Sequence, residues 1–138
     1  MKSENKTLLF LVDDDALYVK ALEIEFLQNT DFMVETFATA ELCMARLSEK
    51  PNLIILDYHL DGIDKSAMNG LNALKKIKSI NQDLPVVMLS SQDKIEVAIN
   101  CMHHKAFDYV VKSETTFVRL KKIIDVLLRY QRLEKQLG

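Results

Sequence analysis

The chain is predicted to be an α/β protein whose helices cover both faces of a parallel sheet. Short apolar runs alternate with amphipathic segments, five strand–helix pairs follow one another, and no internal repeat or Pro/Gly linker interrupts them. Such alternation is typical of parallel sheets built from right-handed crossovers. A chain of 138 residues, 49% of them hydrophobic, is long enough to fold as one domain around a sizeable core.

The first strand is expected at residues 8–12, because a wholly apolar run indicates a strand buried on both faces. Asp15 is expected to cap the helix that follows. The spacing predicts a buried stripe on this helix formed by Leu17, Ala21, Ile24 and Leu27. Residues 32–37 are mixed in polarity, so we assign them to a strand at one edge of the sheet.

The middle of the chain repeats the pattern. Thr39 is expected to cap a second helix, which ends before Pro51, and residues 53–56 form the third strand. A polar loop of residues 58–69 is the only long connection. It leads to a helix whose apolar side consists of Leu71, Leu74 and Ile77.

The last two strands are expected at residues 86–89 and 106–111. Ser91 or Asp93 would cap the helix between them, whose apolar face consists of Ile95, Ala98, Ile99 and Met102. The final helix spans about 115–137. Its a/d-like spacing indicates either a helix that extends beyond the core or a dimer seam formed by Leu120, Ile123, Leu127, Tyr130 and Leu137.

Carboxylates gather where two of these strands end. Asp13, Asp14 and Asp15 follow the first strand directly, and Asp57 follows the third. In open α/β sheets, ligands bind at the carboxyl ends of the strands. Because like charges repel, the cluster is expected to hold a hard cation that takes oxygen ligands, and Mg²⁺ fits this description.

A hydroxyl and an ammonium group end the next two strands at the same rim. Ser90 ends the fourth strand and Lys112 ends the fifth. Metal-binding acids, a nucleophilic carboxylate, a hydroxyl and an ammonium together suit phosphoryl transfer, because the cation and the donors neutralise the phosphoryl oxygens. A carboxylate nucleophile would form an aspartyl-phosphate.

Four segments of the chain, in this order, resemble the receiver domains of two-component response regulators. They are residues 10–15 (Phe-Leu-Val-Asp-Asp-Asp), 53–57 (Leu-Ile-Ile-Leu-Asp), 85–91 (Pro-Val-Val-Met-Leu-Ser-Ser) and 106–112 (Ala-Phe-Asp-Tyr-Val-Val-Lys). The resemblance covers roughly residues 7–128. It implies a flavodoxin-like (βα)5 fold, doubly wound, with a five-stranded parallel sheet in the order 2-1-3-4-5.

The resemblance also implies a function and a metal site. Asp57 would accept a phosphoryl group from a histidine kinase or phosphotransfer protein of a two-component or phosphorelay system. The chain would then change conformation to regulate a partner or output domain. Asp14, Asp57 and the backbone carbonyl of His59 would ligate Mg²⁺, with Asp13 helping through water.

Other residues of the rim receive roles from the same resemblance. Ser90 and Lys112 would bind the phosphoryl oxygens, and Tyr109 would swing inward when Ser90 moves. Position alone, and not the resemblance, singles out His59 and Gln92. Each stands two residues beyond a strand end, where its side chain is expected to face the phosphoryl group and could influence its lifetime.

The chain departs from the family pattern at three places. Asp61 stands where the family usually has a proline. Gly70 comes five residues later than the family's glycine, which indicates an insertion around residues 62–68 whose role the sequence does not reveal. Ser113 follows Lys112 where the family usually has a cis proline, so the bond between them could be cis or trans.

Two other functions stay open from the sequence. A receiver-shaped scaffold that never takes phosphate is compatible with Asp61, the insertion and Ser113. A phosphatase resembling the haloacid dehalogenases would use Asp13 as its nucleophile, although no late acidic pair completes the metal site of that family. In the leading interpretation the chain is not a conventional enzyme, because it catalyses only its own phosphorylation and dephosphorylation.

Composition narrows the partners and the location. A net charge of −2 and the lack of a basic helix-turn-helix segment argue against direct binding of nucleic acid. We recognise no secretion signal and no membrane-spanning stretch. Cys43 and Cys101 are expected to be reduced thiols of a cytoplasmic protein.

We expect one domain of residues 1–138, either a stand-alone receiver or a fragment of a longer regulator, and a homodimer stays open.

Overall fold

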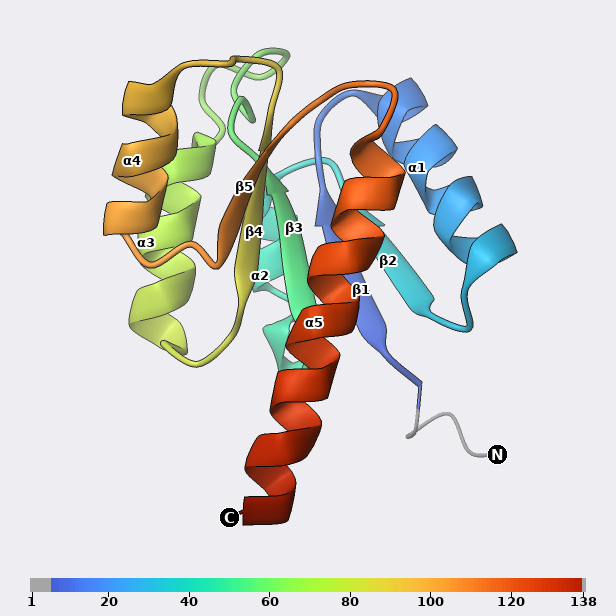
Figure 1. Ribbon diagram of the computed structural model, residues 1–138. Coiled ribbons are helices and arrows are strands. Elements are labelled where there is room, and N and C mark those ends of the chain that lie inside the picture. Colours follow the sequence, from blue (N-terminus) through green and yellow to red (C-terminus); the bar gives the residue numbers. More distant parts are fainter. Residues whose placement is uncertain (1–5, 138) are drawn as a thin grey trace.

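The computed structural model describes residues 6–137, in which five parallel strands lie between two layers of helices (Figure 1). The strands are β1 (Leu8–Val12), β2 (Met33–Phe37), β3 (Leu53–Asp57), β4 (Val86–Ser90) and β5 (Asp108–Val111). They follow the order β2-β1-β3-β4-β5. The predicted flavodoxin-like topology is confirmed, and β2 is the expected edge strand.

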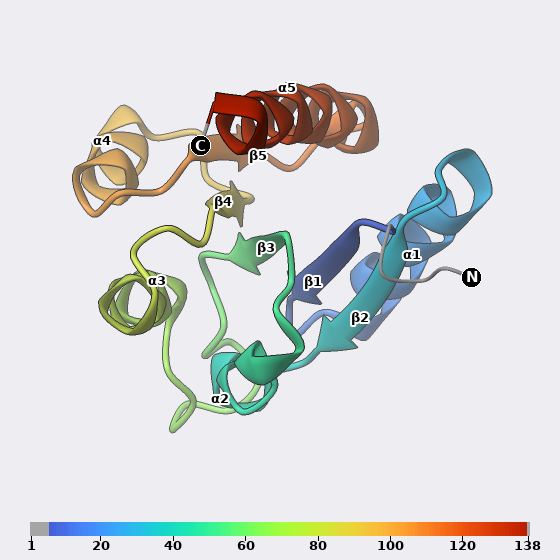
Figure 2. The ribbon, with the colours of Figure 1, turned by 90° about the horizontal axis from the view of Figure 1, so that it is seen from below.

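The helices of this part of the chain form the two outer layers. They are α1 (Ala16–Asn29), α2 (Ala40–Met44), α3 (Gly70–Ile80), α4 (Ile95–His103) and α5 (Thr116–Leu137), with a 3₁₀ turn at Leu47–Glu49. α1 and α5 cover one face of the sheet, and α2, α3 and α4 cover the other (Figure 2). The side chains of Asp15, Thr39 and Asn69 accept backbone hydrogen bonds and so cap α1, α2 and α3.

Burial on both faces explains the wholly apolar runs of the inner strands. Successive side chains of a strand point to opposite sides. In β3, Ile54 and Leu56 pack towards α2, α3 and α4, whereas Leu53 and Ile55 pack towards α1 and α5. Every residue of β3 and β4 is buried. The carboxyl ends of these strands are therefore held rigidly, and the polar residues there have fixed positions.

The buried face of α1 is not the predicted one. Its buried residues are Val19, Leu22 and Phe26, and the Phe26 ring meets the Phe117 ring of α5 edge-on at 4.9 Å. The predicted stripe of Leu17, Ala21, Ile24 and Leu27 is exposed. Both sides of this helix carry apolar residues, so spacing alone could not identify the buried side. The exposed apolar side begins beside the acidic rim.

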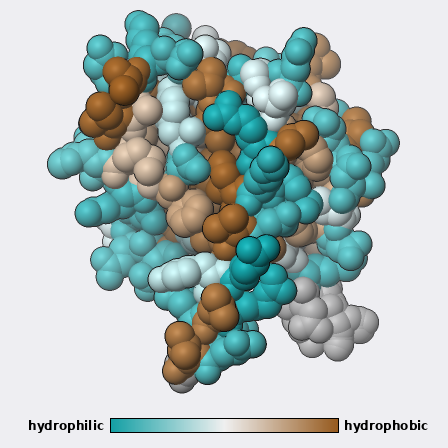
Figure 3. Space-filling view, viewed as in Figure 1, coloured by the Kyte–Doolittle hydropathy of each residue, from teal (hydrophilic) through white to brown (hydrophobic). Residues whose placement is uncertain are grey.

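The predictions for α4 are also wrong in two respects. The helix begins after Lys94, which makes no side-chain capping bond, so neither Ser91 nor Asp93 is its cap. Of the predicted face, Ile95, Ile99 and Met102 are exposed, and Cys101 is buried instead. α4 lies at the edge of the sheet, where only a narrow strip of a helix meets the core. Figure 3 shows the resulting apolar side chains on its surface.

α5 extends past the end of the sheet (Figure 1). Its buried residues are Thr116, Leu120, Ile124 and Leu127, so two residues of the predicted seam belong to the core instead. From Leu128 to Leu137 no residue is buried. Four exposed apolar residues with a 4-3-4 spacing form the α5 stripe, which we define as Val126, Tyr130, Leu133 and Leu137.

Candidate functional site

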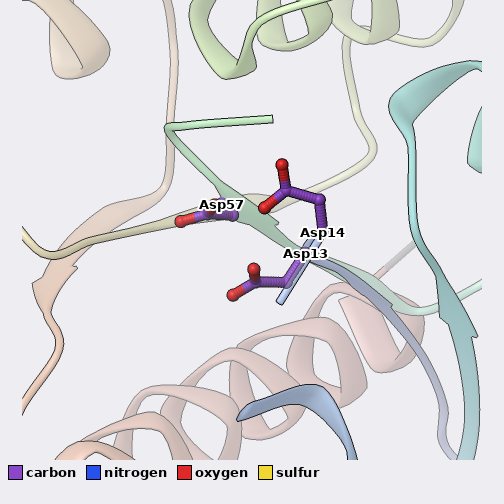
Figure 4. Close-up of side chains that lie close together, drawn as sticks. All are labelled: Asp13, Asp14 and Asp57. Carbon is purple, nitrogen blue, oxygen red and sulfur yellow. The ribbon is translucent and has the colours of Figure 1, made fainter. Parts of the chain in front are cut away.

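Three carboxylates meet at the carboxyl ends of β1 and β3. Because these strands are neighbours, Asp13 and Asp14 after β1 lie beside Asp57, the last residue of β3 (Figure 4). Each residue contributes an oxygen, and these three oxygens lie within 4.8 Å of one another. Asp13 and Asp57 are buried, and Asp14 is half-buried. This donor set suits a hard divalent cation such as Mg²⁺, which takes oxygen ligands.

The three consecutive acids make different hydrogen bonds. Asp13 Oδ1 accepts the backbone N–H of Asp15 at 2.9 Å, and Asp15 Oδ1 accepts the backbone N–H of Tyr18 at 3.1 Å. Asp14 Oδ2 accepts the backbone N–H of Ile63 at 3.2 Å. Asp15 therefore caps α1, as predicted, while Asp13 and Asp14 turn their carboxylates to the cluster.

Lys112 supplies the positive charge of the site. Its Nζ lies 2.8 Å from Asp13 Oδ2 and 3.3 Å from Asp57 Oδ1. Burial lowers the pKa of the Lys112 ammonium, but the hydrogen bond with Asp13 and the charge of Asp57 more than offset this and hold the pKa above its usual value. The lysine therefore stays charged between the two buried acids.

The backbone after Lys112 has an ordinary geometry. No peptide bond in the described chain is cis, so the bond from Lys112 to Ser113 is trans. The Thr116 hydroxyl accepts the N–H of Ser113 at 2.8 Å and donates to the carbonyl of Ser113 at 2.9 Å. This pair of hydrogen bonds fixes the turn from β5 into α5.

Burial, together with the neighbouring acids, raises the pKa of the Asp57 carboxyl to about 7. Burial is the largest cause, and the charge of Asp13 adds to it, whereas the charge of Lys112 acts in the opposite direction. One ammonium does not balance three carboxylates, so the cluster without a cation holds a proton near neutral pH. A divalent cation would displace that proton by neutralising the acids.

Ser90 and Tyr109 are connected through one short segment after β4. Ser90 is completely buried, and its Oγ accepts the backbone N–H of Gln92 at 3.0 Å. The Tyr109 hydroxyl, on the half-buried ring of a β5 residue, donates to the carbonyl of Gln92 at 2.7 Å. A movement of Ser90 would therefore disturb the backbone to which Tyr109 is bound.

His59 and Gln92 both lie half-buried, each two residues beyond a strand end. The His59 ring meets the Tyr58 ring edge-on at 5.0 Å between centroids. Neither side chain makes a hydrogen bond to another residue between 6 and 137, and the backbone carbonyl of His59 also accepts none there. That carbonyl is therefore available as an oxygen ligand.

The long loop after β3 returns to the acid cluster. Besides the Ile63 bond to Asp14, the N–H of Met68 donates to Glu41 of α2 at 3.0 Å. The loop thus bridges the rim and the second helix. The donor to Asp14 is the backbone N–H of Ile63, which any residue except proline would supply, so the sequence could not predict this contact.

Gly70 begins α3 directly against the end of β3. Its N–H donates to the carbonyl of Tyr58 at 3.0 Å. A Cβ at Gly70 would lie 2.3 Å from the carbonyl oxygen of Asp57, well inside contact distance. Only glycine permits this close approach, so Gly70 fixes the backbone of Asp57 despite its later position in the sequence.

Without a cation, Asp57→Asn should stabilise the protein increasingly as the pH rises. The pKa of Asp57 is about 7 in the folded state against an ordinary value of 3.8, so its contribution to stability is full below pH 4 and is lost as the pH rises to 7. In thermal melts with EDTA, the melting temperature of wild type should fall below that of Asp57→Asn as the pH rises from 4 to 8. The free energy of unfolding of wild type should fall by about 1.4 kcal/mol for each unit by which folding raises the pKa of Asp57.

Mg²⁺ should reduce this difference, and Asp31→Asn, which changes an exposed carboxylate outside the site, should follow wild type at every pH. Parallel pH profiles for wild type and Asp57→Asn in EDTA would show that the acids do not crowd one another.

The sequence is similar to a known family over most of its length. The model of the response regulator receiver domain matches residues 9–125. The chain is 31% identical over 125 residues to protein-glutamate methylesterase/protein-glutamine glutaminase of Clostridium acetobutylicum, covering 86% of this chain and 34% of that protein. It is 32% identical over 103 residues to the nitrogen assimilation regulatory protein NtrX of Azorhizobium caulinodans, covering 74% and 22%. The chain thus spans between about a fifth and a third of these relatives.

The fold is similar to that of solved receiver domains. The crystal structure of the receiver domain of NtrX from Brucella abortus matches with a TM-score of 0.75 and 25% identity. The match covers 88% of this chain and 98% of that chain. The five-stranded fold described above is therefore shared with nearly all of that receiver domain.

Proposed function

We propose that this chain, which belongs to the response regulator receiver domain family, is a phosphoacceptor switch whose acceptor is Asp57. The observation that carries this assignment is the unequal engagement of the two buried acids. Both oxygens of Asp13 are engaged, Oδ1 by the N–H of Asp15 and Oδ2 by Lys112. Within residues 6–137, Asp57 Oδ2 has no hydrogen-bond or ion-pair partner. Asp57 is therefore the less engaged of the two carboxylates, which favours it as the attacking group.

The metal proposal rests on the converging oxygens. Asp14 and Asp57, with the free backbone carbonyl of His59, would hold Mg²⁺, and Asp13 would act through a water. Half-exposed Asp14 gives the ion access to solvent, which suits a cation that retains several waters. When bound, the ion supplies positive charge that neutralises the phosphoryl oxygens.

Phosphoryl transfer would proceed by attack of Asp57 on phosphorus. A bond forms between a carboxylate oxygen and phosphorus as the bond from phosphorus to the imidazole nitrogen of a phosphohistidine breaks. The electron pair of that bond leaves with the imidazole. Lys112, already 3.3 Å from Asp57, would then contact one phosphoryl oxygen, and the Ser90 hydroxyl would donate to another.

The conformational change would pass through the Ser90–Gln92–Tyr109 connection. The Ser90 hydroxyl, whose oxygen accepts the N–H of Gln92, would move towards the phosphoryl group to donate to one of its oxygens. That movement would pull on the backbone of Gln92, whose carbonyl holds Tyr109. The ring could then move inward and alter the surface of β5 and α4, where a partner would detect it. The free side chains of His59 and Gln92 would influence hydrolysis, which the decay rate of alanine variants would show.

The two alternative functions are less well supported. A haloacid-dehalogenase-like phosphatase needs Asp13 as its nucleophile, yet both oxygens of Asp13 are engaged. A scaffold that never takes phosphate has no need of a buried acid cluster and an ion-paired lysine. Burying such groups costs stability, so their presence favours a function that uses them.

The location of the protein is proposed from its cysteines. Cys43 and Cys101 are both buried and unpaired, as expected in a reducing compartment, which favours the cytoplasm. Among the described helices none has the length and apolarity needed to cross a membrane. Oxidised thiols in the protein isolated from cells would argue against this location.

Incubation with acetyl phosphate and Mg²⁺ should add one phosphoryl group to the wild type and none to Asp57→Asn, as measured by intact mass. Asp15→Asn is the matched control, because asparagine also caps helices well and Asp15 lies outside the cluster. It should be labelled like wild type. Full labelling of Asp57→Asn would refute the proposal, as would loss of labelling in Asp13→Asn while the metal still binds.

The exposed apolar side of α1 is the proposed docking surface for the phosphohistidine partner. A phosphorus atom delivered to Asp57 must approach the rim where α1 begins, and Leu17 there is 85% exposed. A histidine kinase or phosphotransfer protein that presents its histidine on an amphipathic helix could pack against this side.

Leu17→Ser should therefore slow transfer from a phosphohistidine domain that labels the wild type, by roughly tenfold for the loss of one apolar anchor. Labelling by acetyl phosphate should not change, since this small donor needs no docking. Ile80→Ser at the far end of α3 is the control, because Ile80 is also exposed but lies away from the rim. Equal slowing with both phosphodonors would place the effect in the site itself.

The α5 stripe is proposed to pair two copies of the chain. Its 4-3-4 spacing is that of a coiled-coil seam, and the helix carries it beyond the domain core (Figure 3). Sedimentation should show a dimer for the full chain that Leu133→Lys disrupts, whereas Arg132→Ala, one position off the stripe, should leave it intact. A wild type that stays monomeric at high concentration, with and without phosphorylation, would refute the seam.

A further inference from the structure

Tyr18 lies against the charged end of Lys112. The Lys112 Nζ is 4.4 Å from the centroid of the Tyr18 ring, over the ring face. The ammonium therefore contacts three groups: this ring, Asp13 and Asp57. Only 18% of the Lys112 side chain is exposed, and attraction between a cation and an aromatic ring is strongest when water is excluded.

The first turn of α1 fixes the position of Tyr18. The backbone N–H of Tyr18 donates to the side chain of Asp15, which caps the helix. The backbone N–H of Asp15 donates in turn to the side chain of Asp13. The ring packs against the core between α1, α5 and the sheet. The same acidic tripeptide thus places both the carboxylate and the aromatic ring that contact Lys112.

The Tyr18 hydroxyl does not account for the residue's position. It is buried, and no residue between 6 and 137 offers it a hydrogen bond of normal geometry. Burial raises the pKa of this phenol, while the neighbouring Thr116 hydroxyl and the charge of Lys112 act in the opposite direction. The Thr116 hydroxyl is already engaged with Ser113. The ring, and not the hydroxyl, makes the contact that matters at the rim.

We propose that Tyr18 is a positioning residue that holds the Lys112 ammonium over the acid cluster and guides it to the phosphoryl group. This inference rests on the proposed function, since it concerns how Lys112 reaches a group on Asp57. Lysine has a flexible four-carbon stem, and its reach must be limited by its surroundings. A ring face attracts a cation without demanding one direction, so the ammonium can move from Asp13 towards Asp57 while it stays on the ring.

A purely structural role for Tyr18 predicts something different. If the residue only filled space, any substitution that kept the fold would leave Lys112 and its ligands unaffected. If the ring guides the lysine, Tyr18→Phe should behave like wild type, and Tyr18→Leu should not. The phenylalanine variant also removes the buried hydroxyl, so its melting temperature should not fall.

The test uses the full chain and has two measurements. In NMR spectra, the protons next to Nζ of Lys112 should show a ring-current shift in wild type and in Tyr18→Phe that disappears in Tyr18→Leu. In titrations with beryllofluoride and Mg²⁺, Tyr18→Leu should bind roughly three- to tenfold more weakly than wild type, whereas Tyr18→Phe should stay within about twofold. If Tyr18→Leu does not fold, Tyr18→Met, with an unbranched side chain, replaces it.

The inference would be overturned if the chemical shifts of the Lys112 protons were the same in Tyr18→Leu as in wild type. It would also be overturned if Tyr18→Leu bound beryllofluoride as tightly as wild type does. Failure of the proposed function is a different result. In that case the wild type itself would bind no beryllofluoride, and Asp57→Asn would be indistinguishable from it.

Discussion

The structure depends on charge balance among three carboxylates held at the ends of two adjacent strands. The parallel pairing of β1 with β3 holds Asp13, Asp14 and Asp57 close together, and burial of Asp13 and Asp57 removes much of the water that would screen their charges. Lys112 reaches the cluster from β5, and the backbone N–H groups of Asp15 and Ile63 point at it. The three carboxylates still outnumber the single ammonium, so the site is expected to favour an added cation.

The fold and the acidic rim could be predicted because both follow from short-range patterns. A strand buried on both faces needs an unbroken apolar run, and such runs stand at residues 8–12, 53–56 and 86–89. The polar residue that follows each run then lies at the carboxyl edge of the sheet, and this position does not depend on how the helices pack. Lys112 could be placed at the rim in the same way, although β5 is only partly buried.

The helix faces and the indirect contacts could not be predicted, because they depend on packing between distant elements. α1 has apolar residues on both sides, and the side that is buried is the one whose residues, Phe26 among them, pack against the sheet and α5. The cap at Asp15 is predictable, but its consequence for the Tyr18 ring needs the position of Lys112, which is distant in the sequence. The Ile63 contact on Asp14 comes from backbone, which has no signature in sequence.

The most direct test of the charge-balance account is the titration of the Asp57 carboxyl itself, followed by ¹³C NMR with and without Mg²⁺. Without the cation, the pKa should be near 7, as the buried and crowded cluster requires. With saturating Mg²⁺, it should fall below the ordinary value for aspartate of about 3.9, because the ion favours the ionised form. A titration at an ordinary value in both conditions would contradict the account, since the three acids would then be neither crowded nor responsive to a cation.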